Sequence, residues 1–150
     1  MKIFLGADHA GYDLKEALKL QLTQAGNEVV DVGAGSLEDH DDYPKYAYLL
    51  ATKILGEADS DAAHGILICG SGQGMSIAAN RVRGIRAGLA WNIETGKVAR
   101  TDDNVNVLVL PSRYVATEDA SEIVEAWLSA KFDRDPKYQR RLDELEELYG

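Results

Sequence analysis

Cysteine is the scarcest residue in this 150-residue sequence, and other features are missing as well. The one cysteine, Cys69, excludes a disulfide within the chain and fits a reducing compartment. No apolar run approaches the ~20 residues that a membrane-spanning helix needs. The apolar run at the N-terminus, Ile3 to Leu5, is too short for a secretory signal peptide. We therefore expect a cytoplasmic protein with no membrane partner.

Positive charge is also scarce, since 16 lysines and arginines face 25 aspartates and glutamates and leave a net charge of −9 at pH 7. An acidic protein is repelled by nucleic acids and by anionic membrane surfaces, so neither is an expected partner. A small anionic substrate is still compatible with this charge, because a few focused cations can dominate one site.

The motifs of common cofactors are absent too. The first glycine-containing segment, 6–11, lacks the G-x-G-x-x-G spacing of dinucleotide-binding proteins, and the sequence has no glycine-lysine-serine/threonine motif of a P-loop. The three histidines, His9, His40 and His64, are scattered and form no metal-binding cluster with cysteines or carboxylates in the sequence. We expect no metal and no other cofactor.

The sequence does contain a regular alternation of short apolar runs and helical patterns. Strands that alternate with helices build a parallel sheet covered by helices on both faces. We find no internal repeat or linker, and we predict one domain over residues 1–150. The expected fold class is α/β, a three-layer α/β/α sandwich around a five-stranded parallel Rossmann-like sheet. The strands are expected over 2–6, 28–32, 66–68, 86–91 and 105–110, the helices over 12–25, 43–55, 75–81, 94–100, 118–130 and 136–149, and a polar loop over 33–42.

One glycine-rich segment, residues 65–81, carries the strongest functional signal. Its apolar start predicts a buried strand that ends at Cys69. The turn that follows can leave backbone N–H groups free to face a ligand, because it contains Gly70, Gly72 and Gly74. The next helix would bring partial positive charge to the thiol, which can lower its pKa and make it a thiolate. The alternative is a small buried side chain beside an ordinary turn.

Polar and reactive side chains follow several of the predicted strands. In a parallel sheet, ligands bind outside the carboxyl ends of the strands, so these side chains should lie near one another. A carboxylate, an imidazole, a thiol, loop amides and a guanidinium at one edge have the composition of a site. They are Asp8 and His9 after the first strand, Cys69 to Gly74 after the third, Trp91 and Asn92 after the fourth, and Ser112 and Arg113 after the fifth.

Three motifs together resemble one known family. They are Gly6-x-Asp8-His9-x-Gly11, Asp42-Tyr43-Pro44, and the segment Ile-Cys-Gly-x-Gly-x-Gly-x-Ser-Ile-Ala-Ala-Asn that contains Cys69. In these motifs the chain is similar to ribose-5-phosphate isomerase B and to the related galactose-6-phosphate isomerase subunits, and the resemblance spans nearly the whole chain. It implies aldose–ketose isomerisation of a sugar phosphate, with ribose and ribulose 5-phosphate first, through a cis-enediolate and without a metal or nucleotide cofactor.

The resemblance also implies roles for individual residues. Cys69 falls on the family's general base, which moves a proton between the two reacting carbons, and Ser71 can shuttle the oxygen-bound proton. Backbone amides of the loop would stabilise the charge of the enediolate. The remaining positions would contact the substrate: Gly70, Gly72, Gln73 and Gly74 through the loop, Asp8 and Tyr43 at the sugar, and His9, Arg113, Lys137 and Arg141 at the phosphate.

The last two cations lie on the predicted C-terminal helix. Lys137 and Arg141 are four residues apart and share one helix face. The family often brings such residues to its site across a dimer interface. The resemblance therefore implies a homodimer, or a tetramer, with the active site at the subunit interface and the C-terminal helix packed on a partner subunit. Without the resemblance, an ordinary solvated helix face is the simpler interpretation.

One segment departs from the family. Where the family usually has a histidine that opens the cyclic sugar, this chain has Asp102, and Asp103 replaces a substrate-binding asparagine. An aspartate with the reference pKa of ~3.9 is mostly ionised at neutral pH and is a poor acid unless it is buried. Three hypotheses follow: Asp102 opens the ring with a raised pKa, the ring opens spontaneously or through His9, or the substrate is a tetrose phosphate or another sugar phosphate that needs no ring opener.

Two other classes of function stay open at this point. The chain could be a non-catalytic subunit that binds sugar phosphates within a hetero-oligomer, although it has kept Asp8, His9, Cys69 and Ser71. It could also be a hydrolase that uses a Cys69–His9 pair as nucleophile and base.

Overall fold

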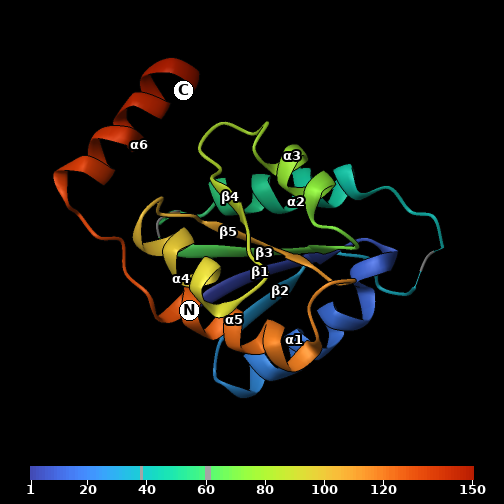
Figure 1. Ribbon diagram of the computed structural model, residues 1–150. Coiled ribbons are helices and arrows are strands. Elements are labelled where there is room, and N and C mark those ends of the chain that lie inside the picture. Colours follow the sequence, from blue (N-terminus) through green and yellow to red (C-terminus); the bar gives the residue numbers. More distant parts are fainter. Residues whose placement is uncertain (38, 60–61) are drawn as a thin grey trace.

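The computed structural model describes residues 1–37, 39–59 and 62–150 (Figure 1). Its centre is a parallel sheet in the order β2-β1-β3-β5-β4. The predicted five-stranded α/β architecture is therefore confirmed. The strands are β1 (Lys2–Ala7), β2 (Glu28–Asp31), β3 (Ala63–Cys69), β4 (Ala87–Leu89) and β5 (Val107–Pro111).

Helices cover both faces of the sheet, as Figure 1 shows. α1 (Tyr12–Gln24), α4 (Ile93–Thr101) and α5 (Thr117–Ser129) contribute to the core on one face, and α2 (Tyr43–Leu55) and α3 (Gln73–Ala79) to the core on the other. Because side chains alternate along a strand, β3 divides its residues between the two cores. Ile66 and Ile68 belong to the core with α1 and α5, whereas Leu67 and Cys69 belong to the core with α2 and α3.

Most elements differ by one or more residues from their predicted bounds, and β3 starts three residues before the predicted 66–68 strand. β4 has three residues instead of the six expected over 86–91, because its edge position leaves it one neighbour, β5. α3 starts and ends two residues earlier than expected. It ends at Ala79 because the side chain of Asn80 bonds both backbone groups of Ala87, at 2.9 Å each, and turns the chain toward β4. In the predicted 33–42 loop, residue 38 lies outside the described residues.

The C-terminal helix, α6 (Pro136–Tyr149), stands apart from the sheet and the other helices (Figure 1). It forms over the predicted residues, and its one buried side chain is Leu142. A helix with so little buried surface gains little stability from its own chain. In the described residues, no helix is both long enough and apolar enough to cross a membrane.

Candidate active site

The sheet order creates a crevice between the ends of β1 and β3. From β1 the chain continues to β2 on one side, whereas from β3 it continues to β4 and β5 on the other. Ligands of open α/β sheets bind at such a switch point, outside the carboxyl ends of the strands. The segments that follow β1 and β3, and the end of β5 beside β3, therefore meet at one place.

Hydrogen bonds from the end of β5 fix the three segments to one another. The Ser112 hydroxyl donates to the carbonyl oxygen of Ala10 at 2.7 Å, and its backbone N–H donates to the carbonyl oxygen of Cys69 at 2.9 Å. The backbone N–H of Arg113 donates to the carbonyl oxygen of Gly70 at 3.0 Å. Ser112 thus connects the loop after β1 to the loop after β3, and both loops hold a defined position around the crevice.

A cavity of about 150 Å³ opens where these segments meet. It contains most of the site residues predicted from the sequence, together with Ala10, which was not predicted. A carboxylate, an imidazole, a phenol, a thiol, a hydroxyl and a guanidinium thus surround one small space. The predicted residues that line it are Asp8, His9, Tyr43, Cys69, Gly70, Ser71, Gly74 and Arg113.

The thiol of Cys69 lies at the end of β3 and is almost completely covered, with 5% of the residue exposed. The backbone N–H of Gly72 donates to its Sγ at 3.2 Å. Burial raises the pKa of Cys69, and backbone N–H groups of Met75, Gly72 and Ser71 offset this only in part. The expected lowering of the thiol pKa is therefore wrong for the protein without substrate, because loss of hydration outweighs the loop amides.

The carboxylate of Asp8 is also buried beside the cavity. Its Oδ1 accepts the backbone N–H groups of Ala10 at 3.1 Å and of Gly11 at 3.2 Å, which caps the short 3-10 helix η1 (His9–Gly11). Burial raises the pKa of Asp8 despite these hydrogen bonds, and the charge of Asp8 contributes in turn to the raised pKa of Cys69. Both acids thus shift toward their protonated forms.

His9 has a carboxylate partner that the sequence analysis did not identify. Asp41 Oδ1 lies 2.9 Å from His9 Nδ1 and also accepts the backbone N–H of His9 at 2.7 Å. The hydrogen bond to Asp41 is the largest cause of the raised pKa of His9. Because 32 residues separate the two, only the acidic composition of the loop pointed toward such a pair.

Two glycines allow side chains to rest directly on the loop backbone. A Cβ atom at Gly70 would lie 2.7 Å from Cζ of Arg113, and one at Gly74 would lie 2.6 Å from Cζ of Tyr43. The bare backbone thus leaves room for the guanidinium on one side of the loop and for the phenol on the other. Gly72, at φ 76°, instead provides the left-handed turn that starts α3.

Six of the residues that the family resemblance implies for the site do not line this cavity, and Trp91 and Asn92 border another cavity. Gly72 and Gln73 lie within the loop and the first turn of α3, and the Gly72 amide is directed at Sγ rather than at the open space. Asp102 and Asp103 follow α4, which runs antiparallel to the strands. They therefore lie near the amino ends of the strands, away from Cys69 at the carboxyl end of β3. Asp102 Oδ1 accepts the Thr101 hydroxyl at 2.7 Å. Lys137 and Arg141 are on α6.

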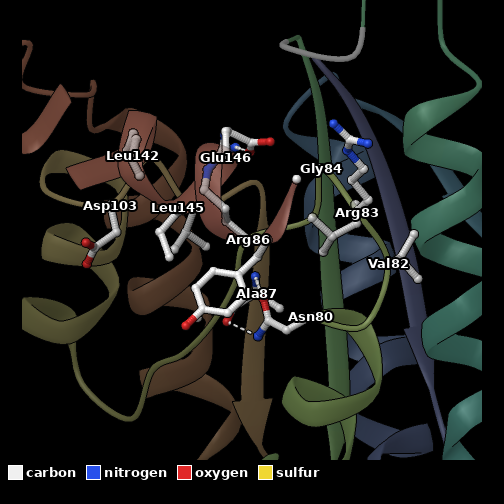
Figure 2. Close-up of a pocket in the computed structure, with 15 residues that line it drawn as sticks. Asn80, Val82, Arg83, Gly84, Arg86, Ala87, Asp103, Leu142, Leu145 and Glu146 are labelled. Carbon is white, nitrogen blue, oxygen red and sulfur yellow. Dashed lines mark hydrogen bonds and ion pairs between the residues drawn. The ribbon is translucent and has the colours of Figure 1, made fainter. Parts of the chain in front are cut away.

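Asp103 borders a different and larger cavity, of about 490 Å³, between α6 and the β4 edge of the sheet. Figure 2 shows Asp103 on one side of this space, with Leu142, Leu145 and Glu146 of α6 above Arg86 and Ala87. Glu146 approaches Arg86 at 4.0 Å. Within one chain, therefore, neither Asp103 nor α6 reaches the cavity of Cys69.

Cys69 and His9 are each hydrogen-bonded to a different partner. Sγ accepts a hydrogen bond from a backbone amide, and the imidazole Nδ1 is bonded to Asp41. Among the described residues, no group of three or more histidine, cysteine, aspartate and glutamate side chains is placed to hold a metal ion.

The fold and this cavity define a class of protein: an α/β protein whose small-molecule site lies at the switch point of a Rossmann-like sheet and is built around a buried thiol. The family described as Ribose/Galactose Isomerase matches residues 3–145. This match covers most of the chain, and the chain belongs to that family, which confirms the resemblance found in the motifs.

Relatives of known structure and sequence agree with this assignment. Ribose-5-phosphate isomerase B of Mycolicibacterium paratuberculosis is 39% identical over 147 residues, covering 98% of this chain and 91% of that protein. The crystal structure of a ribose 5-phosphate isomerase from Thermotoga maritima has a TM-score of 0.90 at 44% identity and covers 97% of both chains. The structure of ribose-5-phosphate isomerase B from Mycoplasma genitalium with bound ribulose-5-phosphate has a TM-score of 0.93 at 39% identity, covering 98% of this chain and 95% of that one.

Proposed function

We propose that this protein interconverts ribose 5-phosphate and ribulose 5-phosphate, with Cys69 as the base. The observation that carries the proposal is the enclosure of Cys69, Asp8, Ser71 and Arg113 in one small cavity of a ribose/galactose isomerase fold. The bound ribulose-5-phosphate of the Mycoplasma genitalium relative supports this choice of substrate.

The chemistry requires a base beside a carbon acid and a donor beside each reacting oxygen. Cys69 Sγ removes the proton from the carbon next to the carbonyl, the carbonyl oxygen becomes an enediolate oxygen, and Sγ returns the proton to the neighbouring carbon. The Ser71 hydroxyl moves the proton between the two oxygens. Because the resting thiol is protonated, it first gives up that proton to water in the cavity, and the Gly72 N–H stabilises the thiolate that results.

We also propose that the working unit is a homodimer, or a tetramer built from dimers, in which each cavity is completed by a second copy. Two observations support this. Lys137 and Arg141 lie on a helix that stands apart from the other elements, and Asp102 follows α4 at the end of the sheet opposite to Cys69. We infer that a second copy brings these three residues to the cavity of its partner, because they lie away from the cavity of their own chain. Lys137 would supply charge to the phosphate without the paired donors of an arginine.

A tetrose phosphate is the second candidate substrate, and it is favoured by one observation. No histidine stands at position 102, and Asp102 instead accepts a hydrogen bond from Thr101. A four-carbon sugar phosphorylated at its terminal hydroxyl has no oxygen placed to close a five-membered ring, so it requires no acid to open one. A hexose phosphate, by contrast, would require the same ring opening as ribose 5-phosphate.

The test is isomerisation by the purified protein, followed by NMR, with phosphorylated four-, five- and six-carbon aldoses and ketoses. Conversion of ribose 5-phosphate supports the first proposal, and activity confined to tetrose phosphates supports the second.

Cys69→Ala should remove nearly all proton transfer while phosphate ligands still bind. Near-normal turnover by this variant would overturn the role of the base. No turnover by the wild type alone, restored by an unlike subunit, would indicate a hetero-oligomer.

A further inference from the structure

The carboxylate of Asp41 is the most completely bonded acidic group beside the cavity. It lies in the loop between β2 and α2, and its side chain is 4% exposed. Oδ1 accepts from the backbone N–H of His9 at 2.7 Å and lies 2.9 Å from Nδ1 of the same residue, and Oδ2 accepts from the Tyr46 hydroxyl at 2.8 Å. Burial by itself would raise the pKa of Asp41, but these hydrogen bonds outweigh it and lower that pKa, so the group is a carboxylate at neutral pH.

We propose that Asp41 is a positioning residue that holds His9 as a cationic ligand for the phosphate of the substrate. The inference rests on the proposed function in one respect, namely that the ligand is a sugar phosphate. Asp41 fixes both the backbone and the ring of His9, because one oxygen contacts the N–H and Nδ1 together. A protonated imidazole that donates from Nδ1 to a carboxylate still has its Nε2–H for a ligand. His9 lines the cavity together with Arg113, so the two cations can hold one phosphate.

The charged groups around His9 favour its protonated form. Asp41 bonds the ring, and the carboxylate of Asp8, on the same turn, adds a weaker attraction; both raise the pKa of His9. Opposing charge comes from Arg113 across the cavity, and the ring of His40 lies 6.0 Å away between centroids. Tyr43 and Cys69 complete the lining. The hydrogen bond from Tyr46 on α2 fixes the second oxygen of Asp41, so the carboxylate cannot rotate away from the imidazole.

This arrangement predicts a specific pH dependence. A histidine with the reference pKa of ~6.5 is largely neutral at pH 7.5. With its pKa raised, His9 keeps its charge to a higher pH, and the affinity for phosphate should persist until the pH passes that raised value. Removing the charge of Asp41 should move the loss of affinity to lower pH. At pH 5.5, His9 should be protonated both in the wild type and in the variant that lacks the charge of Asp41. The two proteins should then bind phosphate almost equally.

The first experiment measures His9 directly by NMR of the imidazole nitrogens, with His9→Gln to assign the signals. In the wild type, the ring should titrate above ~6.5 and shift on addition of inorganic phosphate. In Asp41→Asn, the titration should move down in pH, and phosphate should bind about tenfold more weakly at pH 7.5. Asp39→Asn is the matched control, because it removes the same charge from an exposed position of the same loop and should leave both values unchanged.

Tyr46→Phe provides a graded variant that keeps the ring and removes one hydrogen bond to Asp41. It should lower the pKa of His9 and the phosphate affinity by less than Asp41→Asn does.

In turnover, Asp41→Asn should raise KM for the sugar phosphate at pH 7.5 with kcat largely kept. An unchanged His9 titration in Asp41→Asn, or a loss of phosphate affinity that is equal at pH 5.5 and 7.5, would overturn the proposal. Binding of phosphate is read without turnover, so failure of isomerisation would overturn the proposed function and leave this inference standing.

Discussion

At the scale of single residues, the cavity depends on side chains that lie against bare backbone. The guanidinium of Arg113 occupies the space that a Cβ atom of residue 70 would need, at 2.7 Å from its Cζ. Arg113 is in turn connected to this loop by the hydrogen bond from its backbone N–H to the carbonyl oxygen of Gly70. The glycine and the arginine therefore act as one unit, and changing the first should displace the second.

Gly70→Ala should impair phosphate binding more than folding. The atoms in conflict are at the end of a flexible side chain, so the guanidinium can move aside and the free energy of unfolding should change by less than about 1 kcal/mol. The displaced guanidinium should raise KM for the sugar phosphate about tenfold. Kinetics and urea unfolding together check this, with Gly35→Ala as the control, since a Cβ there meets no atom within 4 Å. Unchanged KM would contradict the assigned position of Arg113.

Sequence reasoning predicted which residues would lie together where chemistry and strand order agreed. Asp8, Cys69 and Arg113 follow three different strands, and the parallel sheet brings all three to one edge. Asp41 was not predicted as the partner of His9. Its position depends on the path of an irregular loop, and no periodic sequence pattern indicates that path. The pKa of Cys69 was predicted in the wrong direction, because the local glycine turn is visible in the sequence whereas the depth of burial is not.

At the scale of elements, α1 is joined to β2 by a buried lysine. The side chain of Lys15 is completely covered, and its Nζ donates to Asp31 Oδ2 at 2.6 Å, to Glu16 at 2.7 Å and to the carbonyl oxygen of Ala34 at 3.1 Å. Asp31 also bonds Lys19 and the backbone N–H of Gly33. Burial favours the neutral acid, but the hydrogen bonds from the two lysines and Gly33 prevail and lower the pKa of Asp31.

Asp31→Asn should destabilise the protein by about 2–4 kcal/mol at pH 7, because it leaves a buried ammonium group with less negative charge around it. The folded pKa is lowered, so the stabilisation by Asp31 is present above the unfolded value of ~3.9 and is lost as the pH falls through the folded value. The difference from the wild type should therefore shrink below pH 4. Urea unfolding at pH 7 and at acidic pH measures the free energy of unfolding of the wild type and of Asp31→Asn. If the two proteins differ by the same amount at every pH, the ion pair is not the cause of the difference.

The elements themselves were predictable where hydrophobic runs are long. β1, β3 and β5 form the middle of the sheet, and buried residues in the centre of each run made them visible in the sequence. β4 was predicted too long, because a strand at the edge pairs on one side only and the sequence does not show where that pairing stops. The order of the strands also fixes the switch point, and with it the site.

At the scale of the whole molecule, the chain separates the residues that the proposed reaction needs. Cys69 lies at the carboxyl end of the central strand β3, Asp102 follows α4 near the amino ends of the strands, and Lys137 and Arg141 lie on the projecting α6. The resemblance to the family pointed to these residues, but a list of residues does not state which copy of the chain supplies each one. The fold adds that Asp102, Lys137 and Arg141 lie away from the cavity of Cys69 within one chain.

Mixing two inactive variants tests the shared site. Cys69→Ala and the double variant Lys137→Glu/Arg141→Glu should each be nearly inactive. In a mixed dimer, one cavity combines the intact thiol of one chain with the intact helix of the other, so random mixing should restore about a quarter of wild-type activity. Co-expression or unfolding and refolding of the mixture, followed by an activity assay, measures this. No recovery despite formation of the mixed dimer would show that each cavity uses the C-terminal helix of its own chain.

The buried state of Cys69 has a consequence for damage in an oxidising cell. Peroxides attack thiolates, and the route from sulfenic to sulfonic acid begins only at a sulfur that is ionised and accessible. Here the thiol is mainly protonated and little exposed, since burial raises the pKa of Cys69 and 5% of the residue is exposed. The burial that keeps this thiol protonated also protects it, so the chain can keep a cysteine at its candidate site without a second cysteine to rescue it.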